Sequence, residues 1–260
     1  VAGTNLYTVG EAWGASHDAI IAMTDDRRGE ITSAFRFDLQ LKDMDDWRKL
    51  PCKLEDMRAF NADNAFTDNP HVWPLVYLED HDFPRAASRY GSSLPQYSAR
   101  SAKLLATMML SLRGTPYIYQ GQEIGMTNFP FERIEDYNDV QAHNGWRNQV
   151  LSGHVPAAQY LHNLAQVSRD NARTPMQWDD TPHAGFTTAE PWFAVNPNYR
   201  QVNARAQAAD PDSVLSFYRA MIRLRRAWRC LSGGQYADIS PPGSQVYAYV
   251  RRGDGAAAVV

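Results

Sequence analysis

The sequence predicts an α/β fold, because short apolar segments alternate with segments of helical periodicity. Each strand-like segment ends in polar or charged side chains, and the first three lead into a helical pattern. From about Gly233 the pattern changes to short strand-like segments alone. We therefore expect strands that pair in parallel through crossover helices, followed by a small β region.

The strand-like segments occur four times, at residues 5–14, 31–40, 74–82 and 115–125. In the second segment Phe35, Phe37 and Leu39 alternate with charged residues, which is the period of a β-strand. Strands that are separated by helical segments in this way are typical of parallel β/α units.

Helical periodicity is clearest in residues 98–112 and 212–228. The first of these segments is followed by Gly114, which favours helix termination. The second has an apolar stripe and a basic C-terminal end, which suits the helix dipole. A weaker amphipathic pattern and two helical pieces in a long excursion complete the expected helices: residues 47–60, 132–150 and 157–170.

Four parallel β/α units are half of what a closed (β/α)8 TIM barrel requires. Half a barrel leaves two raw sheet edges. We therefore expect residues 1–232 to form the C-terminal half of such a barrel, and residues 233–260 to begin an antiparallel β domain of the sandwich type. The chain begins at Val1 without a methionine and ends within a strand-like segment, so we expect it to be part of a longer protein.

The composition excludes several classes of partner. The net charge is −3 and the basic residues are scattered, so we expect no nucleic-acid partner. No apolar run approaches the roughly 20 residues that span a membrane. No signal peptide is visible, but the chain is expected to lack the N-terminus of its protein, so a cytoplasmic location is the expectation and export is the alternative. The sequence specifies no oligomeric state.

The sequence shows no metal or cofactor motif. The seven histidines lack metal-ligand spacing, and there is no phosphate loop, dinucleotide fingerprint or nucleophile elbow. We therefore expect no metal and no organic cofactor. Cys52 and Cys230 are expected to be reduced thiols unless the fold brings them together.

The ends of the strand-like segments carry the groups best suited to chemistry, as in other parallel β/α barrels. Glu11 ends the first segment and Asp82 the third, so both carboxylates are expected to point into one mouth. Two carboxylates with different pKa values suit cleavage of a glycosidic bond. Taken singly, Glu11 fits a helix N-terminal acid, Asp82 a turn former and His81 a core histidine. The cluster of charged groups at the end of the third segment favours a functional role, because burying several such groups is costly unless they have a function.

Four motifs stand at or after these strand ends: TVGEAWG, HDFPRAASRYG, GTPYIYQGQEIGMTNFPF and RDNARTPMQW. Together they resemble the α-amylase superfamily of retaining glycosidases, glycoside hydrolase family 13, and most closely its oligo-1,6-glucosidase and α-glucosidase branch. The resemblance covers nearly the whole chain and implies strands five to eight of that barrel. It also implies a retaining, exo-acting α-glucosidase that releases glucose from the non-reducing end of short α-glucosides.

The resemblance implies roles for individual residues. Glu11 resembles the general acid/base, Asp82 the third carboxylate that favours the distorted sugar, and His81 its partner on the same glucose. Arg173 resembles the arginine that closes the blind end of the pocket, which implies a small oligosaccharide or disaccharide substrate. The alternative for Arg173 is a structural ion pair with a loop carboxylate such as Asp170.

Two departures from the family pattern flank His81 and Asp82. Asp80 stands where the pattern has asparagine, and Phe83 stands where it has a polar residue. Phe83 is expected to make the rim of the next sugar site apolar, and Trp13 to add a stacking surface. Packing is the alternative role for both aromatic side chains.

The family nucleophile, an aspartate at the end of the fourth barrel strand, has no counterpart in this sequence. The motif FRFD at residues 35–38 resembles it superficially, but it follows the general acid, so we reject Asp38. The chain alone is therefore predicted to hydrolyse no glycoside. The alternatives are a sucrose isomerase, a trehalose-6-phosphate hydrolase or, outside enzymes, a binding scaffold like the heavy chains of amino-acid transporters.

Overall fold

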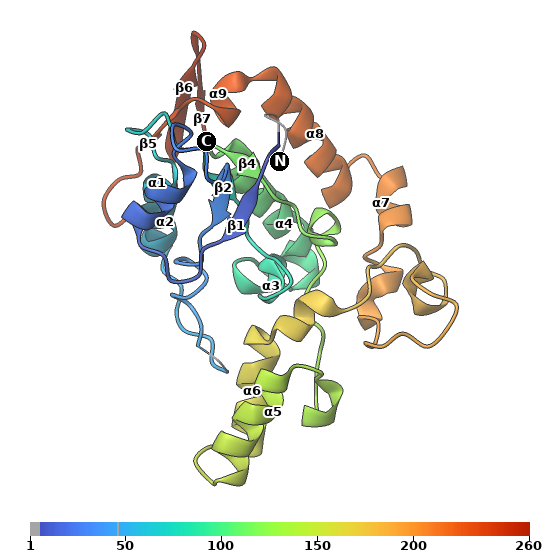
Figure 1. The fold of residues 1–260 in the computed structure, drawn as a ribbon. Helices are drawn as coiled ribbons and strands as arrows, with labels where there is room; N and C mark the ends of the chain where they lie inside the picture. Colours follow the sequence, from blue (N-terminus) through green and yellow to red (C-terminus); the bar gives the residue numbers. More distant parts are fainter. Residues whose placement is uncertain (1–5, 46) are drawn as a thin grey trace.

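The computed structural model describes residues 6–45 and 47–260 (Figure 1). Asn5, the first residue of the expected first strand, lies outside them. Two pairs of short strands run parallel, β1 with β2 and β3 with β4. Their bounds are β1 (Val9–Glu11), β2 (Ser33–Phe35), β3 (Leu75–Val76) and β4 (Thr115–Pro116).

β2 lies beside β3, so the two pairs form one row in chain order. The Ser33 hydroxyl donates to the Trp73 carbonyl at 2.9 Å, and the Tyr77 hydroxyl donates to the Arg36 carbonyl at 2.8 Å. The strands are shorter than the sequence predicts. After β4, the fourth segment turns at Gly121 with a φ of +90°, which favours glycine.

Long helices pack on the row of strands where the apolar periodicity predicts them. The helix expected over residues 98–112 is α4 (Pro95–Ser111), which begins three residues earlier and ends one residue earlier, and residues 212–228 contain α8 (Val214–Ala227). The Ser213 hydroxyl caps α8. The two helices pack against each other, and their apolar faces fill the main core with Leu105, Met109, Tyr218 and Met221.

One helix begins later than its pattern predicts. The sequence predicts a helix over residues 47–60, whereas α2 spans Leu54–Asn64. Asp45 accepts two backbone N–H groups of the turn that follows it, which competes with helix formation. The residue before Pro51 is also disfavoured in the helical conformation, so the helix starts only after this proline.

The long excursion projects from the strands as a helical hairpin (Figure 1). It contains α5 (Val140–Gly145), which continues into a turn of π-helix, η3 (Trp146–Leu151), and then α6 (Ala157–Val167). Aromatic side chains fill its core, and Trp47 stacks on Tyr160 with ring centroids 5.3 Å apart. A short 3-10 helix, η4 (Arg169–Arg173), then brings the chain back to the strand ends.

The remaining helices are short and connect these parts. They are α1 (His17–Thr24), α3 (Ala86–Arg89), η1 (Gln122–Ile124), η2 (Ile134–Asp136), η5 (Pro182–Gly185), η6 (Pro197–Arg200), α7 (Ala204–Ala209) and α9 (Arg229–Ser232). Within the described residues, no helix is long and apolar enough to cross a membrane. Cys52 and Cys230 are separate thiols.

An antiparallel sheet ends the chain, as the sequence predicts: β5 (Gln235–Asp238), β6 (Tyr249–Gly253) and β7 (Ala256–Val259). It packs on the C-terminal end of α4. The Tyr249 hydroxyl lies 2.6 Å from the Ser111 hydroxyl, and Arg251 donates to the Ser111 carbonyl at 2.7 Å. The sheet therefore shares its core with the helices that cover the strands.

The ion pair between Arg58 of α2 and Asp238 of β5 predicts a pH-dependent link between the two parts. Arg58 Nε donates to Asp238 Oδ2 at 2.8 Å. Burial raises the pKa of Asp238, but hydrogen bonds from Arg58 and Ser240 outweigh it and hold that pKa below its usual value. A lowered folded-state pKa contributes stability above the unfolded pKa of about 4, and this is lost as the pH falls through the folded pKa.

We therefore expect Asp238→Asn to lower the free energy of unfolding by about 1–2 kcal/mol at pH 7, and by less at pH 3. Urea denaturation at both pH values measures this difference. Asp68→Asn, at an exposed position, is the matched control and should change neither value. An equal loss at the two pH values would contradict a role for the Asp238 charge.

Candidate active site

Polar side chains converge where the ends of the four strands meet. Glu11 is the last residue of β1, and it is exposed. It lines a cavity of about 210 Å³ together with residues at or after the ends of β2, β3 and β4: Phe35, Glu79, Asp80, His81, Tyr117, Ile118 and Tyr119. Glu11 and His81, which the sequence singled out, therefore border the same space.

Asp82 accepts hydrogen bonds from the returning excursion. Arg173 Nη2 donates to Asp82 Oδ1 at 2.8 Å, and Arg173 Nε donates to the His81 carbonyl at 3.0 Å. His81 Nε2 lies 3.4 Å from Asp82 Oδ2. Asp170, the alternative partner of Arg173, instead accepts two backbone N–H groups on its Oδ2. Arg173 is thus anchored to the strand end that carries the candidate carboxylate.

Arg169 is a site residue that the sequence analysis missed. Its Nη1 donates to Asp82 Oδ1 at 3.3 Å, while its Nε and Nη2 donate to the two oxygens of Asp139 at 2.7 Å each. The hydrogen bond to Asp139 raises the pKa of Arg169 above its usual value. A signal was present in the sequence, because Arg169 and Arg173 begin and end the same short RDNAR segment.

Buried Arg85 joins the segments that carry the site residues. Arg85 Nη1 donates to the Gln120 carbonyl at 2.6 Å, and its Nε and Nη2 each donate to a carbonyl of η4 at 3.3 Å. Glu79 lies 3.4 Å from Arg85 Nη1 and accepts the Ala86 N–H. Burial raises the pKa of Glu79, and the charge of Arg85 opposes this shift. The Glu79 carboxylate is therefore committed to a buried pair.

A second cavity, of about 270 Å³, reaches Asp82, and both predicted aromatic residues line it. Glu11 and Asp82 therefore line neighbouring cavities, whereas the sequence predicts a single mouth for both carboxylates. Trp13 is 63% exposed and rests on Phe37, with ring centroids 5.0 Å apart. Phe83 is 3% exposed, and the Arg89 guanidinium lies 5.1 Å from its ring centroid. Trp13 thus offers an open ring surface, whereas Phe83 forms part of the buried wall.

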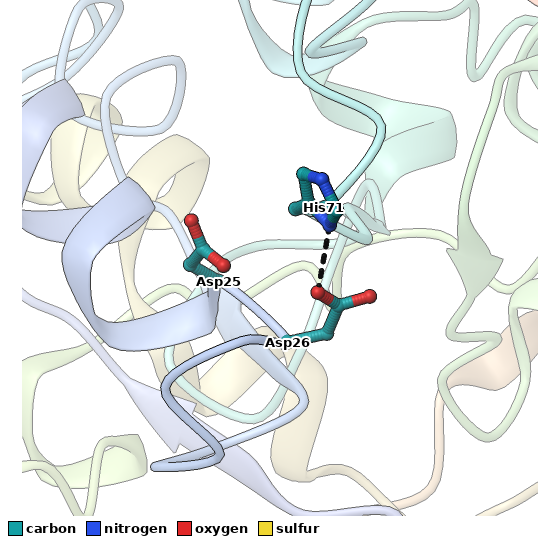
Figure 2. Close-up of side chains that lie close together, drawn as sticks. All are labelled: Asp25, Asp26 and His71. Atoms are coloured by element: carbon teal, nitrogen blue, oxygen red, sulfur yellow. Dashed lines mark hydrogen bonds and ion pairs between the residues drawn. The ribbon is translucent and has the colours of Figure 1, made fainter.

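One cluster with metal-ligand chemistry lies away from this site. Asp25, Asp26 and His71 offer ligand atoms within 4.8 Å of one another, and His71 Nδ1 lies 2.9 Å from Asp26 Oδ1 (Figure 2). Asp25 follows α1 and pairs with the segment before β3, so the cluster lies at the N-terminal ends of the strands. A hydrogen bond from Arg27 holds the pKa of Asp25 well below its usual range. Arg27 thus already neutralises Asp25.

A protein-family model and curated proteins match nearly the whole chain. The family model described as the alpha amylase catalytic domain matches residues 2–234. The oligo-1,6-glucosidase of Parageobacillus thermoglucosidasius is 39% identical over 95% of this chain and 44% of its own length. The oligo-1,6-glucosidase of Bacillus cereus is 38% identical over 95% of this chain and 45% of its own length.

Solved structures give a second group of relatives with the same coverage. The trehalulose synthase of Pseudomonas mesoacidophila has a TM-score of 0.93 and 44% identity, over 97% of this chain and 46% of that one. A mutant isomaltulose synthase of Erwinia rhapontici in complex with D-glucose has a TM-score of 0.94 and 40% identity, over 98% of this chain and 46% of that one. The chain therefore spans about half the length of the relatives it matches.

The buried Arg85 predicts a large stability effect. Arg85→Met leaves Glu79 buried without its cation and removes the hydrogen bonds to three carbonyls. We expect the free energy of unfolding to fall by about 3–5 kcal/mol, as measured by urea denaturation. Arg100→Met, on the exposed face of α4, is the control and should stay within about 0.5 kcal/mol of the parent chain. A loss under about 1 kcal/mol for Arg85→Met would mean that other contacts hold these segments.

Proposed function

The chain belongs to the α-amylase family, and on this premise we propose that it is the C-terminal half of the barrel of a retaining α-glucosidase. Its strands β1 to β4 are then strands five to eight of the barrel. Residues 1–232 complete the catalytic domain and residues 233–260 begin the C-terminal β domain. The observation that carries the proposal is the set of Asp82, His81 and Arg173 beside the cavity of Glu11.

The proposed chemistry uses two of the chain's carboxylates. Glu11 protonates the leaving oxygen and later deprotonates water, which its exposed position on the cavity permits. Asp82 accepts hydrogen bonds from the glucose and stabilises its cationic, flattened form. Neither role requires a metal or an organic cofactor.

Arg173 gives the reason to propose action at chain ends. It ties η4 to the His81 carbonyl and to Asp82, so the excursion lies against the strand end that holds the sugar. A wall at that position makes a blind pocket, which accepts the non-reducing glucose of a short oligosaccharide or disaccharide. An open groove for long polysaccharides does not fit this arrangement.

The nucleophile is proposed to come from a preceding barrel strand. Asp38, the carboxylate after β2, lies 3.1 Å from Arg36 and follows the general acid in the chain. The relatives are about twice as long as the matched region, which leaves room for the other strands.

A sucrose isomerase is the second candidate. The solved relatives at 40–44% identity include a trehalulose synthase and an isomaltulose synthase. Trp13 also offers an open aromatic surface to the cavity that reaches Asp82. Such a surface can hold a released fructose by stacking, so that it attacks the glucosyl-enzyme before it diffuses away.

Product analysis separates these two functions. The chain, extended to contain the complete barrel, is incubated separately with maltose, isomaltose and sucrose, and the products are resolved by chromatography. We expect glucose from maltose or isomaltose, with sucrose merely hydrolysed or untouched. Isomaltulose or trehalulose from sucrose would instead establish the isomerase, and no turnover of any sugar would contradict both functions.

Removal of the acid tests the role of Glu11. We expect Glu11→Gln in the extended protein to lower kcat/KM by at least about 10³-fold, because general acid and base catalysis are both lost. Glu190→Gln, at an exposed position, is the control and should leave kcat/KM unchanged. The 260-residue chain without the preceding strands is expected to release no glucose. Hydrolysis by this chain that Glu11→Gln abolishes would refute the missing-nucleophile proposal.

A further inference from the structure

We propose that Asp80 is a positioning residue that orients Asp82 through its side chain and, through its charge, sets the upper pH limit at which Glu11 can act as an acid. This inference rests on the proposed function, because it assigns roles to Glu11 and Asp82. It concerns a carboxylate that the mechanism above does not use.

The positioning role follows from one hydrogen bond. Asp80 Oδ1 accepts the Asp82 N–H at 2.7 Å, across a turn of two residues. This contact fixes the backbone at the point where Asp82 leaves the strand end. In that orientation the Asp82 carboxylate meets Arg173 and His81. Any side chain with an oxygen at the same place can make this contact, so it does not require a charge.

The electrostatic role follows from the shared cavity. Asp80, Glu11 and His81 line the same space of about 210 Å³. Burial raises the pKa of Asp80, and the negative charges of Asp82 and Glu11 raise it further. The hydrogen bond from the Asp82 N–H and the charge interaction with His81 act in the opposite direction. Asp80 and Glu11 repel each other when both are ionised, so the charge of each acts on the other.

The groups around Asp80 come from several elements. Tyr77, on the same segment as Asp80, interacts with its charge and donates its hydroxyl to the Arg36 carbonyl. Tyr117 and Tyr119 follow β4 and line the same cavity. Arg169 and Arg173 reach this region from η4, and both donate to Asp82. Asp82 thus receives two guanidinium groups, one from Arg169 and one from Arg173.

Asp80 and Asp82 are neighbouring carboxylates with different proposed roles. Arg169 and Arg173 hold the Asp82 carboxylate by hydrogen bonds at the place where a stabiliser of positive charge is proposed. The negative charge of Asp80 disfavours loss of the proton from Glu11, which a general acid requires. An asparagine at position 80 would keep the hydrogen bond to Asp82 but lose this second effect.

The experiment compares Asp80→Asn with Asp80→Ala in the extended enzyme, by kcat/KM against pH on the sugar that the parent cleaves. We expect the alkaline limb of the Asp80→Asn profile to lie about 0.5–1 pH unit lower than in the parent. Asp80→Ala should show the same displacement and, in addition, a loss of about 10–100-fold at the optimum, because the turn before Asp82 is released. Glu190→Gln is the matched control and should move neither limb.

A second readout does not depend on turnover. The side-chain carboxyl ¹³C resonance of Glu11 is titrated in the extended protein, with Glu11→Gln to assign the signal. We expect its midpoint to fall by about 0.5–1 pH unit in Asp80→Asn. If the extended parent cleaves no sugar, the proposed function fails while this titration still decides the coupling. An unchanged midpoint and an unchanged alkaline limb in Asp80→Asn would overturn the charge role, and Asp80→Ala with the parent's kcat/KM would overturn the positioning role.

Discussion

The rest of the site depends on the contacts that the buried guanidinium of Arg85 makes. It lies between the turn after β3, the loop after β4 and the 3-10 helix η4, and it bonds to each of them. Glu79 and carbonyl oxygens offset part of the cost of burying its charge. Gly121 belongs to the same arrangement, because a Cβ there would lie 3.1 Å from Arg85 Nη1. The strand ends and the excursion are therefore held in one fixed relation.

Because the strand ends and the excursion are held together, positive charge among the described residues gathers at Asp82 and not at Glu11 or Asp80. Arg169 and Arg173 both bond to Oδ1 of Asp82, while Asp139 holds Arg169 from the other side. A carboxylate has about four acceptor positions, so Oδ2 of Asp82 keeps capacity for a further hydrogen-bond donor. Glu11 and Asp80 face their cavity without an arginine bonded to them in the described structure. The two carboxylates proposed for catalysis thus have opposite electrostatic surroundings.

The excursion matters to the site because it has a core of its own. Aromatic side chains pack between α5, η3 and α6, and Trp47 extends that packing to the loop after β2. A loop of this length without internal packing would return to the strands in many conformations. With this core, its last turn presents Arg169 and Arg173 at a defined place. The two arginines lie on a loop, but that loop is held by its own aromatic core and by their hydrogen bonds to Asp82.

The sequence by itself determined the β/α alternation, the positions of α4 and α8, the antiparallel end of the chain and the candidate residues Glu11, His81, Asp82 and Arg173. These follow from periodicity and motifs, which are local properties of the chain. The tertiary structure alone decided that Phe83 is a buried wall, that Arg169 joins Asp82 to Asp139, and that Asp80 shares a cavity with Glu11. Each of these depends on side chains far apart in the sequence. Burial and charge coupling are properties of the space between segments, and no single segment encodes them.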